Sequence, residues 1–295
     1  MIARLSHHTH LWHIWGLSGA VVFLLSIWLF AGASEPLTVF VEAVEPPPRQ
    51  LILEESAPEL LAAAYAIFQI DTGALIASQA ATSVRSIASI TKLPAAAAVR
   101  RMSWYHMPII LTASDIDTPG TAGNLAIADR YTGRELLYPL LLTSSNDAAA
   151  ALERVSEGEL LPAMHALAVR AEAFDTQFTD ASGLSAGNRS TVADLAALTS
   201  HLWRVDQTLF TLTALPQYLA ETQGWQNNSP VIDQPGYRGG KHGFTEAAGR
   251  TIVAVFDETI AGQTVTVGYV VLGSRDLTTD VATLRAFVQE HATLE

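Results

Sequence analysis

The chain has 295 residues, 49% of them hydrophobic and 16% charged, a formal net charge of −12, and no cysteine. This composition is typical of a globular protein, and the acidic balance argues against a nucleic-acid partner. The absence of cysteine excludes disulfides, thiol catalysis and cysteine-bound zinc. Lys92 and Lys241 are the only two lysines, against fifteen arginines. Lysine can act as a base and arginine cannot, but chance could also leave two lysines, so the remaining sequence must decide.

The N-terminal part of the chain predicts a link to a membrane. Residues 14–32 are almost continuously apolar, and 19 residues give about 28 Å of helix, enough to cross a bilayer. Arg4 precedes this run and acidic residues follow it, which places the body of the protein outside the cytoplasm. We expect a retained single-pass anchor in the bacterial cytoplasmic membrane. Cleavage after Ala33, in the signal-peptidase pattern Ala31-Gly32-Ala33, would instead give a secreted protein.

These features divide the chain into three parts. Residues 1–34 are the cytoplasmic N-terminus and anchor or signal peptide, and residues 35–55 are a linker that contains Pro46-Pro47-Pro48. Residues 56–295 remain as the exported body, which is long enough for one domain with a large core.

The elements of the body follow from hydrophobic periodicity and turn residues. We expect strands over residues 64–70 and 74–77 around the turn Asp71-Thr72-Gly73. Helices are predicted over residues 89–102, 136–155, 160–173 and 191–203. Strands over residues 249–256 and 264–272, a turn at Ala261-Gly262 and a helix over residues 278–290 complete the chain. This order predicts an α+β fold, with an antiparallel sheet built from both chain ends and a helical subdomain beside it.

The first chemical motif is Ser89-Ile90-Thr91-Lys92 at a predicted helix start. Residues i and i+3 share a helical face, so the Lys92 amine can reach the Ser89 hydroxyl. Free N–H groups at a helix start also stabilise an oxyanion. A lysine base near neutral pH needs a pKa about 3 units below 10.4, and burial and the charge of Lys241 both act in that direction.

Two further motifs follow in the chain. Ser144-Ser145-Asn146 precedes an alanine-rich segment, and Lys241-His242-Gly243 follows a glycine pair on a predicted strand. The order S-x-x-K, S-x-N, K-x-G is the pattern of the penicillin-recognising serine enzymes. With their flanking residues, the motifs resemble the D-alanyl-D-alanine carboxypeptidases, the low-molecular-mass penicillin-binding proteins of peptidase family S11. The resemblance covers about residues 62–284.

The resemblance implies a β-lactamase/transpeptidase-like fold and a serine-type D-Ala-D-Ala carboxypeptidase. The substrate would be a peptidoglycan stem peptide ending in D-Ala-D-Ala, with β-lactams as covalent inhibitors and no cofactor or metal. The implied catalytic residues are Ser89 as nucleophile, Lys92 as base, Ser144 as proton relay and Asn146 as the group that holds the substrate amide. The implied substrate-binding residues are Lys241, which attracts the terminal carboxylate, His242 and Gly243, together with Phe244, whose N–H completes an oxyanion hole with that of Ser89.

The sequence departs from this family at several positions. His242 stands where relatives carry threonine, so we expect either a histidine donor that titrates near pH 6.5 or a side chain that points away and a weakened site. Pro94 is expected to remove a helix hydrogen bond and kink the nucleophile helix. Leu277 falls where relatives often carry arginine, with Arg275 nearby.

Two other functions are considered. A non-catalytic sensor of peptidoglycan is suggested by His242, although a pure binder needs no nucleophile and base. A β-lactamase requires a deacylating residue, and between residues 158 and 221 no glutamate stands in the Glu-x-x-Asn setting of the class A enzymes. Labelling by a fluorescent penicillin separates the sensor from the enzyme.

Overall fold

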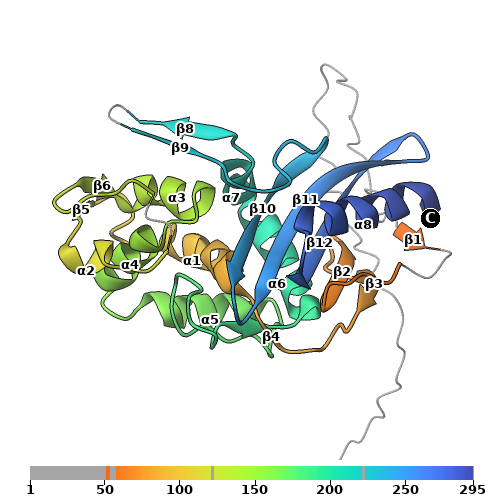
Figure 1. Ribbon diagram of the computed structural model, residues 1–295, viewed down its shortest axis with the longest axis horizontal. Helices are drawn as coiled ribbons and strands as arrows, with labels where there is room; N and C mark the ends of the chain where they lie inside the picture. Colours follow the sequence, from red (N-terminus) through yellow and green to blue (C-terminus); the bar gives the residue numbers. More distant parts are fainter. Residues whose placement is uncertain (1–50, 54–57, 121–122, 221–222, 295) are drawn as a thin grey trace, which may run out of the picture. The chain divides into compact units, whose positions relative to one another are not determined.

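A five-stranded antiparallel sheet in the order β10-β11-β12-β2-β3 forms the centre of the molecule (Figure 1). This computed structural model describes residues 51–53, 58–120, 123–220 and 223–294, which all belong to one compact unit, residues 48–295. The five strands are β2 (Ala64–Gln69), β3 (Leu75–Gln79), β10 (Tyr237–Thr245), β11 (Gly249–Ile260) and β12 (Gln263–Ser274). The prediction of a sheet built from both ends of the chain is confirmed.

Both faces of the sheet are buried, because successive side chains of a strand point to opposite sides. On β12, Tyr269 and Val271 point to the face covered by α8 (Leu277–His291), and Val270 between them points to the face covered by α6 (Val192–Val205). Branched and aromatic side chains of this kind favour strands with two buried faces. Among the described strands, β10 pairs with β11 alone and is therefore an edge strand.

A helical block lies between β3 and β10 in the sequence. Its helices are η1 (Ala88–Thr91), α1 (Lys92–Val99), α2 (Ala113–Ile116), α3 (Gly133–Leu142), α4 (Asn146–Val155), α5 (Leu160–Arg170), α6 and α7 (Gln207–Thr213). Every residue of α1 is buried, and this helix contacts α3, α4 and α5. The four consecutive alanines of α1 favour the helix and leave room for three neighbours to approach.

Short strand pairs complete the fold. They are β1 (Leu51–Leu53) with β13 (Ala292–Leu294), β4 (Arg85–Ser86) with β7 (Arg189–Ser190), β5 (Pro108–Ile110) with β6 (Arg130–Thr132), and β8 (Gln217–Leu219) with β9 (Gly224–Gln226). The β8–β9 hairpin, which extends from the body in Figure 1, was not predicted. Its strands have three residues each, too short to give a periodic pattern.

Two expectations about helices are wrong. The helix predicted over residues 136–155 is two helices, because Ser144 adopts a left-handed conformation (φ +60°) and Ser145 caps α4 by accepting a hydrogen bond from the amide of Ala148. Pro94 does not interrupt its helix. It occupies the third position of α1, within the first turn, where amides lack helical partners.

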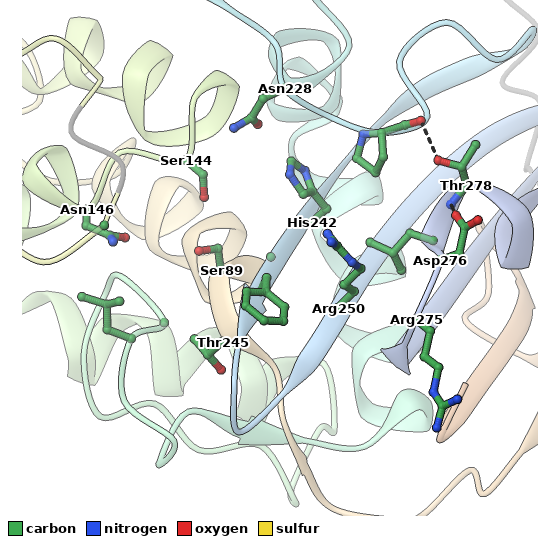
Figure 2. A pocket seen from close by; sticks show the side chains of 17 residues that line it. Ser89, Ser144, Asn146, Asn228, His242, Thr245, Arg250, Arg275, Asp276 and Thr278 are labelled. Carbon is green, nitrogen blue, oxygen red and sulfur yellow. Dashed lines mark hydrogen bonds between the residues drawn. The ribbon is translucent and has the colours of Figure 1, made fainter. Parts of the chain in front are cut away.

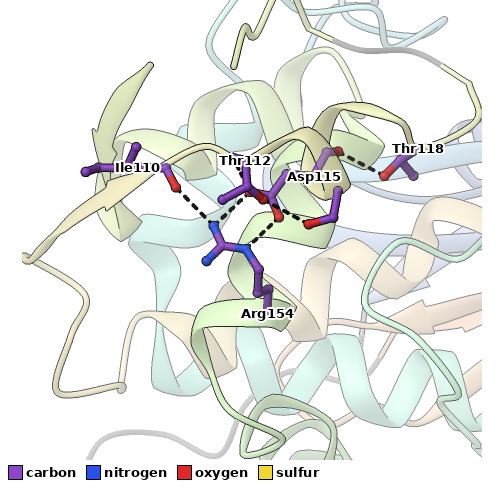
Figure 3. A network of polar contacts seen from close by, with 6 residues as sticks. Ile110, Thr112, Asp115, Thr118 and Arg154 are labelled. Atoms are coloured by element: carbon purple, nitrogen blue, oxygen red, sulfur yellow. Dashed lines mark hydrogen bonds and ion pairs between the residues drawn. The ribbon is translucent and has the colours of Figure 1, made fainter. Parts of the chain in front are cut away.

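An ion pair between the half-exposed Arg154 and the buried Asp115 joins α2 to α4 (Figure 3). The Arg154 guanidinium donates to both oxygens of Asp115 at 2.8 and 2.7 Å and to the carbonyl of Ile110 at 3.1 Å. Asp115 also accepts from the amide and the hydroxyl of Thr112, which closes the first turn of α2. The contact ties α2 to the last turn of α4.

The predicted anchor, residues 14–32, lies outside the residues that the structure describes. Among the described residues, no helix has both the length and the apolar character needed to cross a bilayer. The predicted boundary at residue 55 also falls in an undescribed segment.

Candidate active site

A cleft of about 630 Å³ lies between the helical block and the edge strand β10 (Figure 2). Its walls carry most of the predicted site residues. They include Ser89, Ser144, Asn146, His242, Gly243 and Phe244. The cleft continues past β10 toward Arg250 and the start of α8.

Ser89 lies on the short helix η1, in a backbone that is tightly enclosed. Ala88 before it has a left-handed φ of +48°, a conformation that costs free energy for a residue other than glycine. A Cβ on Gly183 would collide with the Ala88 carbonyl, and one on Gly243 would collide with the Ser89 amide. Because Gly183 and Gly243 have no Cβ, the loop around Gly183 and the strand β10 can both approach the backbone of Ser89 closely.

Lys92 is fully buried, and its amine has three polar neighbours. The Nζ atom lies 2.9 Å from the Ser89 hydroxyl, 2.7 Å from the Asn146 side-chain oxygen and 2.5 Å from the Ser182 carbonyl. Two of these groups only accept hydrogen bonds, whereas a hydroxyl can also donate one. A neutral amine would thus donate to Asn146 and Ser182 and present its lone pair to the Ser89 proton.

The surroundings of Lys92 favour this neutral form. Burial, and then the charge of Lys241, lower the Lys92 pKa well below its ordinary value, against an opposing effect of Asp180. Burial and the charge of Lys241 are the two causes that the sequence predicts. The opposing effect of Asp180 was not predicted.

Asn146 and Ser144 lie at the start of α4. The Asn146 amide nitrogen donates to the Pro119 carbonyl at 2.6 Å while its oxygen accepts from Lys92, so the side chain is held from both ends. Figure 2 shows the Ser144 hydroxyl on the cleft wall above Ser89. The left-handed turn at Ser144, together with the Ser145 cap, places both motif side chains at the cleft.

The loop of residues 180–188 contains Ser182-Gly183-Leu184, which is part of the sequence resemblance, but its contact with Lys92 was not predicted. The Asp180 carboxylate accepts hydrogen bonds from the amides of Ser182, Gly183 and Ser185 and from the side chain of Asn188. Burial would raise the Asp180 pKa, but these hydrogen bonds lower it. The loop thereby holds the Ser182 carbonyl against Lys92. In the sequence, the polar run Asp180-Ala181-Ser182-Gly183 indicates a turn. The atom that contacts Lys92 is the backbone carbonyl oxygen of Ser182, and a motif of side chains does not specify its position.

Lys241 lies on β10 beside the cleft. Its side chain is buried, its Nζ atom donates to the His242 carbonyl at 2.6 Å, and it does not line the cleft. Burial lowers the Lys241 pKa to about 7. Besides burial, the charge of Lys241 lowers the pKa of Lys92, and the contact of Lys241 with a substrate carboxylate stays a prediction.

His242 faces the cleft, so the expectation that it points away is wrong. The expectation that it titrates near pH 6.5 is also wrong. Burial, and then Lys241, Lys92 and Arg250 in their charged forms, lower the His242 pKa to about 2. The imidazole is therefore neutral and offers the cleft one N–H donor without a charge. Within the described residues, no group of three or more histidine and acidic side chains is arranged to hold a metal ion.

Comparison with known proteins agrees with this site. The family model described as D-alanyl-D-alanine carboxypeptidase matches residues 52–276. A D-alanyl-D-alanine endopeptidase of Haemophilus influenzae is 32% identical over 146 residues, 48% of this chain and half of that protein. One of Pseudomonas aeruginosa is 26% identical over 228 residues, 72% of each chain.

Solved structures have the same fold. The D-alanyl-D-alanine carboxypeptidase of Mycobacterium tuberculosis superposes with a TM-score of 0.72 at 24% identity, over 80% of this chain and 94% of that one. The Streptomyces K15 DD-transpeptidase gives 0.71 at 23% identity, over 79% and 99% of the two chains. The structure thus has the α+β fold of the penicillin-binding proteins and transpeptidases, and the chain belongs to the D-alanyl-D-alanine carboxypeptidase family of serine peptidases.

Proposed function

We propose that this protein is a serine-type carboxypeptidase that removes the terminal D-Ala from peptidoglycan stem peptides ending in D-Ala-D-Ala, through an acyl-enzyme on Ser89. The observation that carries the proposal is the Lys92 amine, buried 2.9 Å from the Ser89 hydroxyl between two acceptor oxygens. A sensor of peptidoglycan would need no such base, so this arrangement favours an enzyme.

The reaction begins when Lys92 takes the Ser89 proton and the Ser89 oxygen attacks the carbonyl carbon of the penultimate D-Ala. The negative charge on the substrate oxygen is stabilised by the N–H groups of Ser89 and Phe244, which Gly243 brings close together. Collapse of this intermediate breaks the C–N bond. The leaving amine takes a proton from the Lys92 ammonium through the Ser144 hydroxyl, and D-Ala departs.

Water completes the cycle by attacking the ester carbonyl. The acyl group leaves as a carboxylic acid and the proton returns to the Ser89 oxygen, with Lys92 again as the base. A β-lactam enters the same sequence, but its amine stays tethered to the acyl group and blocks the approach of water. We therefore expect β-lactams to inhibit the enzyme. A β-lactamase is not favoured, because no glutamate between residues 158 and 221 stands in the Glu-x-x-Asn setting of the class A enzymes.

The two endopeptidase relatives suggest a second substrate, a D-Ala bond within a cross-link between two stem peptides. The direct test is to incubate the protein with a pentapeptide ending in D-Ala-D-Ala and with a purified cross-linked dimer, and to follow the products by mass spectrometry. Release of D-Ala from the pentapeptide supports the carboxypeptidase. Cleavage of the dimer alone would replace the proposed carboxypeptidase activity by an endopeptidase activity. Cleavage of neither substrate would support the non-catalytic sensor of peptidoglycan.

We also propose that the catalytic body acts outside the cytoplasm on a membrane anchor formed by residues 14–32. The support is the apolar run and its charge asymmetry, together with a substrate that lies outside the cytoplasmic membrane. Cell fractionation with intact-mass analysis tests this proposal. Full-length protein in the membrane fraction is expected, whereas a mature N-terminus at Ser34 in the soluble fraction would refute the anchor.

A further inference from the structure

The far end of the cleft holds an arginine with no assigned task. Arg250 lies on β11 opposite Phe244, is exposed, and lines the cleft. Its guanidinium lies 5.6 Å from the centre of the Phe244 ring, and it donates no hydrogen bond to any described residue. The side chain is thus positioned by an aromatic face while its five N–H donors stay free for a ligand.

The other cations near Ser89 do not offer a charge to this space. Lys241 is buried and donates to a backbone carbonyl, and His242 is neutral. Arg275 also reaches the rim of the cleft, but Figure 2 shows its side chain extending away from Ser89, whereas that of Arg250 extends toward His242.

Asp276, an acid that also lines the cleft, makes no direct contact with Arg250, although hydrogen bonds from Thr279, and then the charge of Arg250, lower its pKa. Asp276 caps α8, and its oxygens accept from the amides of Thr278 and Thr279 and from the Thr279 hydroxyl at 2.7 Å. No ion pair between Asp276 and Arg250 is formed in the described structure, so the guanidinium remains a permanent positive charge facing the cleft.

Local backbone geometry gives Arg250 its direction. The pairing of β11 with β12 shifts between Arg250 and Ile252, where Gly273 on β12 adopts a left-handed φ of +68°. A bulge of this kind turns a strand locally and redirects its side chains. Beyond it, Ile252 lies buried on the face that α8 covers, and Arg250 lies at the open end of that face.

We propose that Arg250 binds the carboxylate of the residue that leaves from the scissile bond, in place of the Lys241 side chain. This inference rests on the proposed function, because it takes the substrate to be attacked by Ser89. Gly243 touches Ser89, Phe244 is the next residue, and Arg250 is its cross-strand partner. The leaving residue extends roughly 3.5 Å beyond the attacked carbonyl toward its carboxylate, and Arg250 lies farther along the same cleft. The neutral His242 N–H supplies a second donor on the same wall.

A binding experiment on the Ser89→Ala protein tests this assignment without requiring catalysis. The probes are an acetylated tripeptide ending in D-Ala-D-Ala and the same tripeptide with a C-terminal amide. We expect the free acid to bind about 10- to 100-fold more tightly than the amide, the range of a charged hydrogen-bonded pair. Adding Arg250→Gln should remove this preference and leave the affinity for the amide unchanged. Adding Arg275→Gln is the matched control and should keep the preference.

The possible outcomes separate the two proposals. A preference for the acid that survives Arg250→Gln, or no preference in Ser89→Ala itself, overturns the role of Arg250 whether or not the enzyme is active. If Arg250→Gln removes the preference for the acid but the wild-type protein forms no acyl-enzyme, the role of Arg250 in binding the carboxylate is supported and the proposed catalysis is contradicted. Thermal melting of each variant shows whether a lost preference reflects a lost fold.

Discussion

At the scale of single residues, the chemistry depends on a lysine that can lose its proton. The amine of Lys92 is surrounded by groups that accept two hydrogens and offer one, which suits a neutral base. An arginine at this position would keep a cation but could not take the serine proton.

We therefore expect Lys92→Arg to slow acylation of Ser89 by about 10²- to 10⁴-fold, nearly as much as Lys92→Ala. Stopped-flow measurement with a fluorescent penicillin gives the rate of each variant. A Lys92→Arg protein that acylates near the wild-type rate would make Lys92 an electrostatic partner and not the base.

The environment of His242 leads to a second prediction at this scale. Because its pKa is lowered to about 2, the imidazole stays neutral from pH 5 to 8. Acylation should fall toward acid pH as Lys92 becomes protonated, and the wild type and His242→Thr should fall in parallel. A limb near pH 6.5 in the wild type that is absent from His242→Thr would contradict the lowered pKa.

At the scale of elements, the position of α4 matters because its first residue, Asn146, contacts Lys92. The Arg154–Asp115 pair ties α4 to α2, and the Asp115 side chain is only 2% exposed. Burial would raise the Asp115 pKa, but the hydrogen bonds from Arg154 and Thr112 lower it, so the contribution of the pair is present at neutral pH and lost on acidification.

Arg154→Gln should thus reduce the free energy of unfolding by about 1–3 kcal/mol at pH 7, because it leaves a buried carboxylate without its cation. The pair Arg238–Asp257 is the control, since its side chains are 52% and 25% exposed, and Arg238→Gln should cost less than about 1 kcal/mol. Urea titration measures both. Equal losses of unfolding free energy in Arg154→Gln and Arg238→Gln would contradict the claim that burial of Asp115 strengthens its ion pair.

Element prediction from the sequence worked where the pattern was long. The strands of the sheet and α6 and α8 carry sustained periodicity and clear caps, such as Thr191 accepting from the amide of Asp194. The division of residues 136–155 was missed because leucines and alanines continue through it, and the break depends on the left-handed turn at Ser144.

At the scale of the whole molecule, the sequence motifs named the side chains that surround the cleft but not the backbone that holds them. Ser89, Lys92, Ser144 and Asn146 meet as expected. The Ser182 carbonyl and the inward turn of Lys241 arise from tertiary packing, which spacing along the chain does not encode. Arg250 was not predicted, since its approach to the cleft depends on the pairing of β10 with β11.

The most direct test of this account is mass spectrometry of the protein, from about residue 48 onward, after exposure to benzylpenicillin. The mass should rise by that of one penicillin, and peptide mapping should place the adduct on Ser89. Ser89→Ala should show no adduct, while Ser103→Ala, a change at an exposed serine outside the cleft, should be labelled like the wild type. An adduct that persists in Ser89→Ala, or one mapped to another residue, would contradict the assignment of Ser89 as the nucleophile.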